Sequence, residues 1–385
     1  MEQTRKNQWV TLLIAIFSFA VYNTAFQAIP PLIPAITQEF SITAVEAGLV
    51  MSVVIVPGLL LSLPSGWLLN KYQPKKVGIA ALVFITVSSL VTASSTSFEL
   101  LLFGRLLLGF GGILITITSL AIISQWFGNK DLGKATGLWA ASVPITVVII
   151  FPVMSLIITS VGWRFPFYLS SLAGLAAIAL FFFFIKNGPY SKDKEIKSGH
   201  PEYFNPSIWK LGIVCLCAQG AGIAFSTWAP TLFAEFANMP SVQASFLAGL
   251  SSFLTIFFVP FFGYMSDRIE KRRFFLILGP LLMTLTFITL AIGSDIIMIA
   301  SLLLMGVANA MVVVVTNVLP PEILGHSKAS IGFGVISICG SLGSILAIPI
   351  IGLLIDMTGS FAVSLFGMGA FSIVAAIFAF TLKTK

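Results

Sequence analysis

The chain has 385 residues, of which 57% are hydrophobic and only 9% are charged. A soluble domain carries about 25% charged residues, so this composition excludes a soluble protein and predicts a chain that lies in a lipid bilayer. The net charge of +7 does not indicate a nucleic-acid partner, because the basic residues lie in loops between apolar segments, where they orient a membrane protein.

Twelve apolar segments follow one another along the chain, and each is long enough to cross a bilayer as a helix, which takes about 20 residues. Such long segments without period-two alternation favour helices over a β-barrel, the other structure that satisfies backbone polar groups in lipid. The sequence therefore predicts an all-α membrane protein with 12 transmembrane helices. The predicted spans are 9–36, 45–69, 77–95, 98–126, 136–160, 165–186, 208–236, 242–265, 274–293, 296–319, 329–354 and 361–382.

The basic residues predict the orientation of these spans. Nineteen of the 21 Lys and Arg residues fall on one side of the predicted membrane, whereas Arg164 falls on the other side and Arg105 lies inside a span. The side richer in Lys and Arg is the cytoplasmic one. We therefore expect a multi-pass protein of the cell membrane with both termini in the cytoplasm. The first span is too long for a cleavable signal peptide.

No cofactor and no metal site are expected from the sequence. The cysteines Cys215, Cys217 and Cys339 lie inside apolar spans, where they are typical of small core residues. Both histidines, His200 and His326, fall in loops. The sequence therefore brings together no cluster of His, Cys and carboxylate residues that could hold a metal ion.

A spacing of 197 residues relates the two halves of the chain. It carries the basic loop 66–76 onto loop 263–273 and also carries Gly109 onto Gly306. Helix-breaking residues recur at one spacing when a chain contains two homologous units. We predict an N-terminal six-helix bundle, a charged cytoplasmic linker and a C-terminal six-helix bundle. Their expected limits are 1–186, 187–205 and 206–385.

The two basic loops resemble the signature loop between helices two and three of the major facilitator superfamily, Gly-x-Leu-x-Asp-Arg-x-Gly-Arg-Arg/Lys. Asn70 stands where the family has Asp, and the second copy keeps Asp267 and Arg268. The resemblance extends over the whole chain. Further similar stretches are Arg105-Leu-Leu-Leu-Gly109-Phe-Gly111, Gly162-Trp163-Arg164 and Trp228-Ala-Pro230. The resemblance implies two pseudo-symmetric bundles and a secondary transporter, similar to permeases for organic anions, sugar phosphates or cyanate.

In such families this loop acts as a latch for the outward-open state, because a carboxylate favours a helix N-terminus or a neighbouring Arg. Asn70 carries no charge, so the resemblance implies a weaker latch in the first half. The alternative is that these residues only stop the spans from moving through the bilayer. The predicted gating residues are Gly66, Asn70, Lys71, Lys75, Lys76, Gly263, Asp267, Arg268 and Arg272.

Arg105 is the charged residue that lies deep inside a predicted span. A charge at mid-span costs about 2.5–3.5 kcal/mol or more, so its presence needs a reason. It shares one helical face with small and hydroxyl residues, namely Gly109, Gly112, Thr116 and Ser119, which would suit the wall of a water-filled cavity. Arg105 either binds an anionic group or bonds the carbonyls of neighbouring helices near the outer rim.

Polar residues on helices one, seven and ten complete the predicted binding site. Amides in an apolar span need partners, which can be a neighbouring helix or a substrate. The resemblance implies that helices one, four, seven and ten line a central cavity. The predicted substrate-binding residues are Arg105, Tyr22, Asn23, Gln27, Gln219, Ser226, Trp228, Asn309 and Thr316.

We therefore expect a secondary transporter that moves a small solute by rocking two bundles about a mid-membrane site. An organic anion is favoured, because one buried cation has no buried acid beside it. Proton coupling would need a rim acid such as Glu46 or Glu99 or the carboxylate of the substrate, and transport without a proton is the third option. An exporter of drug-like or amphiphilic compounds is the first alternative. A membrane enzyme or sensor is disfavoured, because no nucleophile–base pair is found. We expect a monomer in lipid.

Overall fold

The computed structural model is almost entirely helical over the residues that it describes. Within these residues, 12 helical segments are long and apolar enough to cross a membrane, which confirms the predicted all-α architecture. The described residues are 2–61, 68–69, 71–127, 129–186, 188, 205–236, 238–269, 271–292, 295–325 and 329–382.

The first six spans comprise α1 to α9. Two of these spans are each built from two helices, α1 with α2 and α3 with α4. The helices are α1 (Glu2–Gln27), α2 (Ile29–Phe40), α3 (Ala44–Ser52), α4 (Val56–Leu61), α6 (Pro74–Ala93), α7 (Phe98–Trp126), α8 (Asn129–Val161) and α9 (Phe165–Phe184).

Each of the last six spans is a single helix. They are α10 (Pro206–Phe236), α11 (Ser241–Ile269), α12 (Arg272–Ile292), α13 (Asp295–Leu324), α14 (Ala329–Thr358) and α15 (Phe361–Thr381).

Proline explains the break between α1 and α2, which the sequence analysis treated as one continuous span. Ala28 separates the two helices, and Pro30 and Pro31 follow directly. Proline has no N–H group, so Pro30 cannot donate to the carbonyl of Phe26 four residues earlier. The first span therefore contains a bend at mid-membrane and at least one carbonyl that needs another donor.

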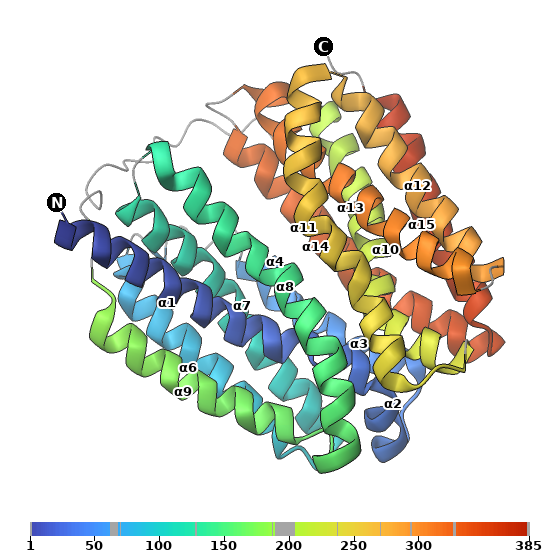
Figure 1. The fold of residues 1–385 in the computed structure, drawn as a ribbon, viewed down its shortest axis with the longest axis horizontal. Helices are drawn as coiled ribbons and strands as arrows, with labels where there is room; N and C mark the ends of the chain where they lie inside the picture. The colour runs from blue at the N-terminus through green and yellow to red at the C-terminus, as the bar shows by residue number, and fades with distance from the viewer. Residues whose placement is uncertain are drawn as a thin grey trace.

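The helices form two groups that meet at one end. Figure 1 shows α1 to α9 on one side and α10 to α15 on the other, closest where α2 and α3 lie and apart near the chain termini. The contacts between the groups include α3 with α14, α8 with α11 and α2 with α10. The linker predicted at 187–205 lies outside the described residues except for 188 and 205.

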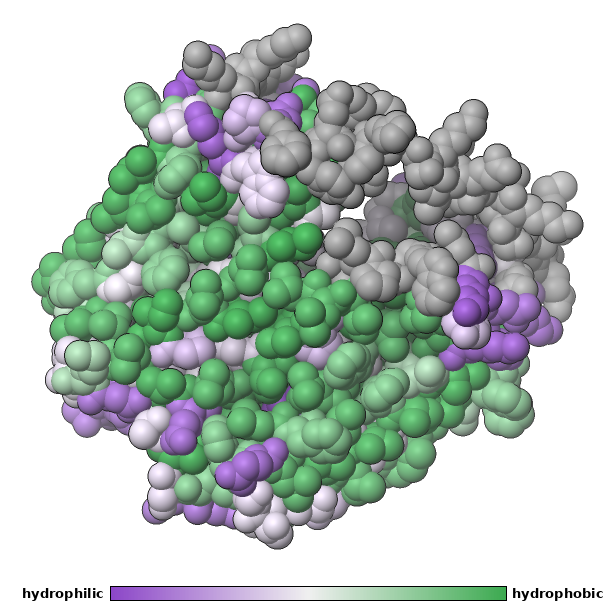
Figure 2. All heavy atoms as spheres, turned by 180° about the vertical axis from the view of Figure 1, so that it is seen from behind, coloured by the Kyte–Doolittle hydropathy of each residue, from purple (hydrophilic) through white to green (hydrophobic). Residues whose placement is uncertain are grey.

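The surface of the molecule is apolar over a broad belt. Figure 2 shows this belt in green, with hydrophilic residues gathered towards the two ends of the helices. Large apolar side chains are exposed within it, such as Phe183 at 69% and Ile292 at 76%. Water would not tolerate this arrangement, whereas lipid chains cover it without cost.

One contact recurs in both groups, and its two partner residues are 107 positions apart in the sequence in each case. Lys75, at the start of α6, donates a hydrogen bond to the Phe182 carbonyl of α9 and lies 5.4 Å from the centre of its ring. Arg273, at the start of α12, donates to the Phe380 carbonyl of α15 and lies 5.2 Å from that ring. The repeated sequence thus holds equivalent helix pairs together in the same manner.

Candidate functional site

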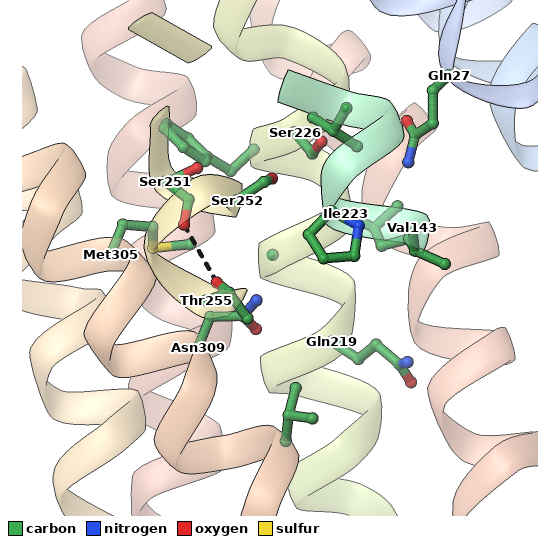
Figure 3. A pocket seen from close by; sticks show the side chains of 15 residues that line it. Gln27, Val143, Gln219, Ile223, Ser226, Ser251, Ser252, Thr255, Met305 and Asn309 are labelled. Atoms are coloured by element: carbon green, nitrogen blue, oxygen red, sulfur yellow. Dashed lines mark hydrogen bonds between the residues drawn. The ribbon is translucent and has the colours of Figure 1, made fainter. Parts of the chain in front are cut away.

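A cavity of about 310 Å³ lies between the two helix groups (Figure 3). Five helices contribute to it, α1 and α8 from the first group and α10, α11 and α13 from the second. Its lining residues are Gln27, Val143, Pro144, Val147, Gln219, Gly222, Ile223, Phe225, Ser226, Ser251, Ser252, Thr255, Met305, Asn309 and Val313.

The cavity lies near the middle of the membrane-spanning helices. Asn309 is 14 residues from the start of the 30-residue helix α13, and Gln27 lies at the break in the first span. At 1.5 Å per residue, Asn309 is about 20 Å from either end of its helix. A polar cavity at this depth is screened from lipid only by the surrounding helices.

Primary amides provide the strongest polar groups of the cavity. Gln27, Gln219 and Asn309 project from three different helices (Figure 3). The Gln219 amide lies against Gly340 of α14, where an added Cβ would be only 1.7 Å from its Oε1 atom. The Gln219 amide can therefore occupy this position only because residue 340 has no side chain.

Hydroxyl groups on α11 face the same cavity. The Thr255 hydroxyl donates to the Ser251 carbonyl at 3.1 Å, and the Ser251 hydroxyl donates to the Ala248 carbonyl at 3.3 Å. The Thr255 hydroxyl also lies 3.5 Å from the Gly306 carbonyl of α13. A hydroxyl that bonds a backbone carbonyl keeps an oxygen that can accept from a ligand. The sequence analysis missed these residues, because the sequence does not show whether a helical Ser or Thr lines a cavity or only bonds its own backbone.

The described cavity lining contains no Lys, Arg, Asp or Glu residue. Apolar residues line the cavity as well, namely Val143, Pro144 and Val147 of α8, Ile223 and Phe225 of α10, and Met305 and Val313 of α13. Among the described residues, no group of His, Cys, Asp and Glu residues could hold a metal ion. The chemistry available to a ligand here is neutral hydrogen bonding together with apolar contact.

Four of the nine predicted binding residues line this cavity, namely Gln27, Gln219, Ser226 and Asn309. Three others bond to backbone carbonyls away from it. The Trp228 indole N–H donates to Ile348 of α14 at 3.2 Å, whereas Asn23 and Thr316 bond within their own helices. Substrate contact by these three residues remains a prediction, and in this structure Trp228 joins α10 to α14.

Tyr22 packs against α7 beside the cavity. Its ring lies over Gly112, where an added Cβ would be 2.2 Å from a ring carbon. The 197-residue spacing relates Tyr22 and Gly112 to Gln219 and Asn309. The first group thus places an aromatic ring and a glycine where the second group places two amides.

Arg105 is fully buried in α7, at 0% exposure. Its Nη1 donates to the Ala25 carbonyl at 2.8 Å, its Nη2 to Phe26 at 3.3 Å and its Nε to Val50 at 3.1 Å. The Phe26 carbonyl is the one that Pro30 leaves without a donor. Val50 lies just before the break between α3 and α4. The guanidinium thus joins two interrupted helices, which is the structural alternative of the sequence analysis, and its contact with substrate remains a prediction.

The small-residue stripe beside Arg105 also packs against helices. An added Cβ at Gly109 would be 2.3 Å from the Val54 carbonyl oxygen, and Ser119 is fully buried. The Thr116 hydroxyl donates to the Gly112 carbonyl at 2.7 Å. The stripe allows close packing around α7, and none of these residues belongs to the described cavity lining.

Two predicted gating residues, Gly66 and Asn70, lie outside the described residues. The second loop contains an ion-pair network, in which Arg272 contacts Asp267 at 3.0 Å and also pairs with Glu322. Lys71 lies 5.6 Å from the Tyr72 ring centre. Lys76 and Arg268 are exposed, and an added Cβ at Gly263 would meet no atom within 4 Å. Gating by this set remains a prediction.

The two groups close tightly at the end opposite the termini. The backbone N–H groups of Ala44 and Val45, in the first turn of α3, donate to the two carboxylate oxygens of Asp356 at 2.8 and 2.9 Å. An added Cβ at Gly352 would be 2.5 Å from the Ala44 carbonyl oxygen. We call this contact between α3 and α14 the outer seam.

A second contact joins the groups beside the outer seam. The hydroxyls of Ser155 in α8 and Ser245 in α11 are 2.6 Å apart and buried. Within the first group, Glu39 pairs with Arg164 at 2.6 Å and accepts a hydrogen bond from the Trp163 indole at 2.5 Å. At the end opposite the termini, the two groups are therefore held together by the Asp356 hydrogen bonds and by the Ser155–Ser245 hydrogen bond.

A helical membrane protein with a polar cavity between two helix groups, closed at one end, has the architecture of a membrane transporter. The sequence matches the family described as Major Facilitator Superfamily over residues 12–256 and 232–385. The chain belongs to this superfamily and is a multi-pass membrane transporter, as the sequence predicted.

Named relatives are transporters of small anions. The chain is 23% identical to a probable nitrate transporter of Staphylococcus epidermidis, with 97% of this chain and 96% of that protein covered. It is 24% identical to a probable sulfoacetate transporter of Cupriavidus necator, with 89% and 86% covered. A probable nitrate/nitrite antiporter of Thermus thermophilus is 27% identical, over 71% of this chain and 64% of that protein.

Solved structures of the same fold support the architecture. A bacterial homolog of the human lysosomal transporter Spinster, in an inward-facing and occupied conformation, superposes with a TM-score of 0.83. Its sequence identity is 15%, with 96% of each chain covered. The nucleoside transporter NupG gives a TM-score of 0.81 at 15% identity, with 97% and 98% covered.

Proposed function

We propose that this protein is a secondary transporter that carries a small organic anion through the cavity between its two helix groups. The observation that supports this most is a mid-membrane cavity with three amides that project from three helices. The named nitrate, sulfoacetate and glucarate transporters among its relatives favour an anion. The cavity volume of about 310 Å³ lies at the small end of ligand sites.

The orientation proposed from the sequence gives the closed end a physiological side. The sequence assigns 19 of the 21 Lys and Arg residues to the other end, which is then cytoplasmic by the positive-inside rule. The conformation described here is then closed towards the outside and spread apart towards the cytoplasm. The two halves, 1–186 and 206–385, would rock about the cavity, and the segment 187–205 would tether them in the cytoplasm.

The outer seam provides the contacts that must break when the cavity opens outwards. A carboxylate at a helix N-terminus contributes about 0.3–1 kcal/mol when exposed and up to ~2 kcal/mol in favourable geometry. Asp356 is exposed but bonds two N–H groups, so we assign it about 1 kcal/mol. Asp356→Asn should therefore shift the conformational equilibrium about fivefold towards the outward-open state.

Distance measurements between spin labels across the outer ends of α3 and α14 would report this shift. Glu99→Gln is the matched control, because Glu99 is a carboxylate in the first turn of α7 at the same end. An unchanged distance distribution in Asp356→Asn would show that the seam is closed by packing alone.

The transport proposal is tested with purified protein in liposomes. Uptake of labelled nitrate, sulfoacetate, D-glucarate and D-gluconate would be compared for the wild type, Asn309→Leu and Asn317→Leu. Asn317 lies on the same helix, bonds its own backbone at 2.7 Å and is absent from the described lining. Loss of uptake only in Asn309→Leu supports the site, whereas equal uptake in both variants rejects it.

Export of amphiphilic compounds is the second candidate function, and one observation favours it. An apolar crevice of about 480 Å³ lies between α1 and α8 and is lined by Trp9, Leu13, Ile145 and Ile149 among others. The substrate of such an exporter would enter from the lipid. Increased sensitivity of a deletion strain to amphiphilic toxins, without any anion-uptake defect, would support export instead.

A further inference from the structure

We infer that the cavity selects monovalent carboxylates that carry hydroxyl groups, in preference to bare oxyanions and to divalent anions. This inference rests on the proposed function and concerns the same cavity. It follows from which hydrogen-bonding atoms of the lining are donors, which are acceptors, and which charges are missing.

The amides supply donors for a carboxylate. Gln27, Gln219 and Asn309 each present two N–H bonds and one carbonyl oxygen. A carboxylate of the solute can accept from the N–H bonds. The three amide oxygens then need donors of their own, because an unpaired acceptor in apolar surroundings weakens binding.

Two of the three α11 hydroxyls in the lining, those of Thr255 and Ser251, bond backbone carbonyls of their own helix and offer acceptor oxygens to a ligand. Thr255 directs its proton to the Ser251 carbonyl, and Ser251 directs its proton to Ala248, at 3.1 and 3.3 Å. Figure 3 shows Thr255 beside Asn309, with the Thr255–Ser251 bond drawn as a dashed line. An acceptor-only ligand such as nitrate would meet these oxygens without a donor to offer, whereas an alcohol would donate to them.

The missing cations limit the charge of the solute. The described lining contains no Lys or Arg, and the Arg105 guanidinium is already used by three backbone carbonyls. One negative charge can be solvated by several neutral donors. A second unpaired charge at mid-membrane would lower the affinity about a hundredfold or more.

The shape of the cavity fits the same class of solute. The amides and hydroxyls lie on α10, α11 and α13 together with α1, whereas Val143, Pro144 and Val147 form an apolar wall on α8. A hydroxylated carboxylate can turn its oxygens to the polar groups and its carbon chain to this wall. A small planar oxyanion would leave much of the apolar wall uncovered.

Two pairs of compounds isolate the two properties. Lactate and propionate differ by one hydroxyl group, and D-gluconate and D-glucarate differ by one carboxylate in place of an alcohol. Ligand binding would be measured as thermal stabilisation of the purified protein and as competition for uptake in liposomes. We expect lactate to bind about tenfold more tightly than propionate, because one hydrogen bond contributes about this factor. Gluconate should bind more tightly than glucarate, and by a larger factor.

Thr255→Val tests the acceptor assigned to α11. It should remove the preference for lactate over propionate, measured as the ratio of the two affinities. Thr136→Val is the matched control, since Thr136 makes the same kind of backbone bond, 2.8 Å to the Leu132 carbonyl, outside the described lining. Asn309→Asp, which keeps the side-chain shape and replaces donors by acceptors, should abolish gluconate binding.

The outcomes separate this inference from the proposed function. Equal or tighter binding of nitrate, propionate or glucarate overturns the inference and leaves anion transport standing. A lactate preference that survives in Thr255→Val also overturns it. If none of these anions stabilises the protein or competes for uptake, both the inference and the proposed anion transport are rejected.

Discussion

Replacing Arg105 with methionine separates its two possible roles. The side chain is fully buried and donates to the carbonyls of Ala25, Phe26 and Val50. Methionine fills a similar volume without donors. The carbonyls of Phe26 and Val50, which lie at helix breaks, would then be unpaired at a cost of about 1–3 kcal/mol each. Relief from burying a charge offsets part of this, so we expect a net loss of about 2–4 kcal/mol.

This loss should appear in the ligand-free protein as a melting temperature lower by several °C, measured by tryptophan fluorescence in detergent. Arg105→Lys should not restore it, because an ammonium group lacks the planar fork that reaches acceptors on two helices. A substrate-binding role predicts another pattern, with an unchanged melting temperature, lost anion uptake and partial rescue by lysine. That pattern would refute the structural role that we assign to Arg105.

Three further substitutions test the packing between helices. Gly352→Leu should force the outer seam apart, because even a Cβ would be 2.5 Å from a backbone oxygen of α3; accessibility of a cysteine placed in the seam would increase. Gly112→Ala should destabilise the protein by about 1–3 kcal/mol through overpacking, because the added Cβ would meet the Tyr22 ring. Gly137→Ala is the control and should leave thermal unfolding unchanged, because a Cβ added there would have no atom within 4 Å. Arg164→Ala should lower stability by about 1 kcal/mol, because its ion pair is partly exposed; no change in the melting temperature would show that this pair contributes nothing.

The number of spans and the fold could be predicted because both depend on properties that each segment carries by itself. Apolar length gives the spans, and helix-breaking residues at one spacing give the repeat. The breaks within the first two spans were missed, although Pro30 and Pro31 signal the first of them. A tally of apolar residues does not register that a proline removes a donor from a carbonyl four residues earlier.

The candidate site was predicted only in part, because a polar residue in a span has several ways to be satisfied. Gln219 and Asn309 face the cavity, whereas Trp228 bonds a carbonyl of α14. The sequence of α10 does not contain this difference, which depends on where α14 passes. Thr255 was missed because its backbone bond makes it resemble any threonine in a helix.

The distribution of hydrogen-bonding groups in the cavity has a consequence for the transport cycle. Most of the hydrogen-bonding groups belong to α10, α11 and α13. A bound solute would therefore stay bound to the C-terminal bundle when the two bundles move relative to each other. The N-terminal bundle would move past the bound solute and contact it through the apolar side chains of Val143 and Val147 on α8. Bulkier or polar residues at these two positions would then slow turnover more than they weaken affinity.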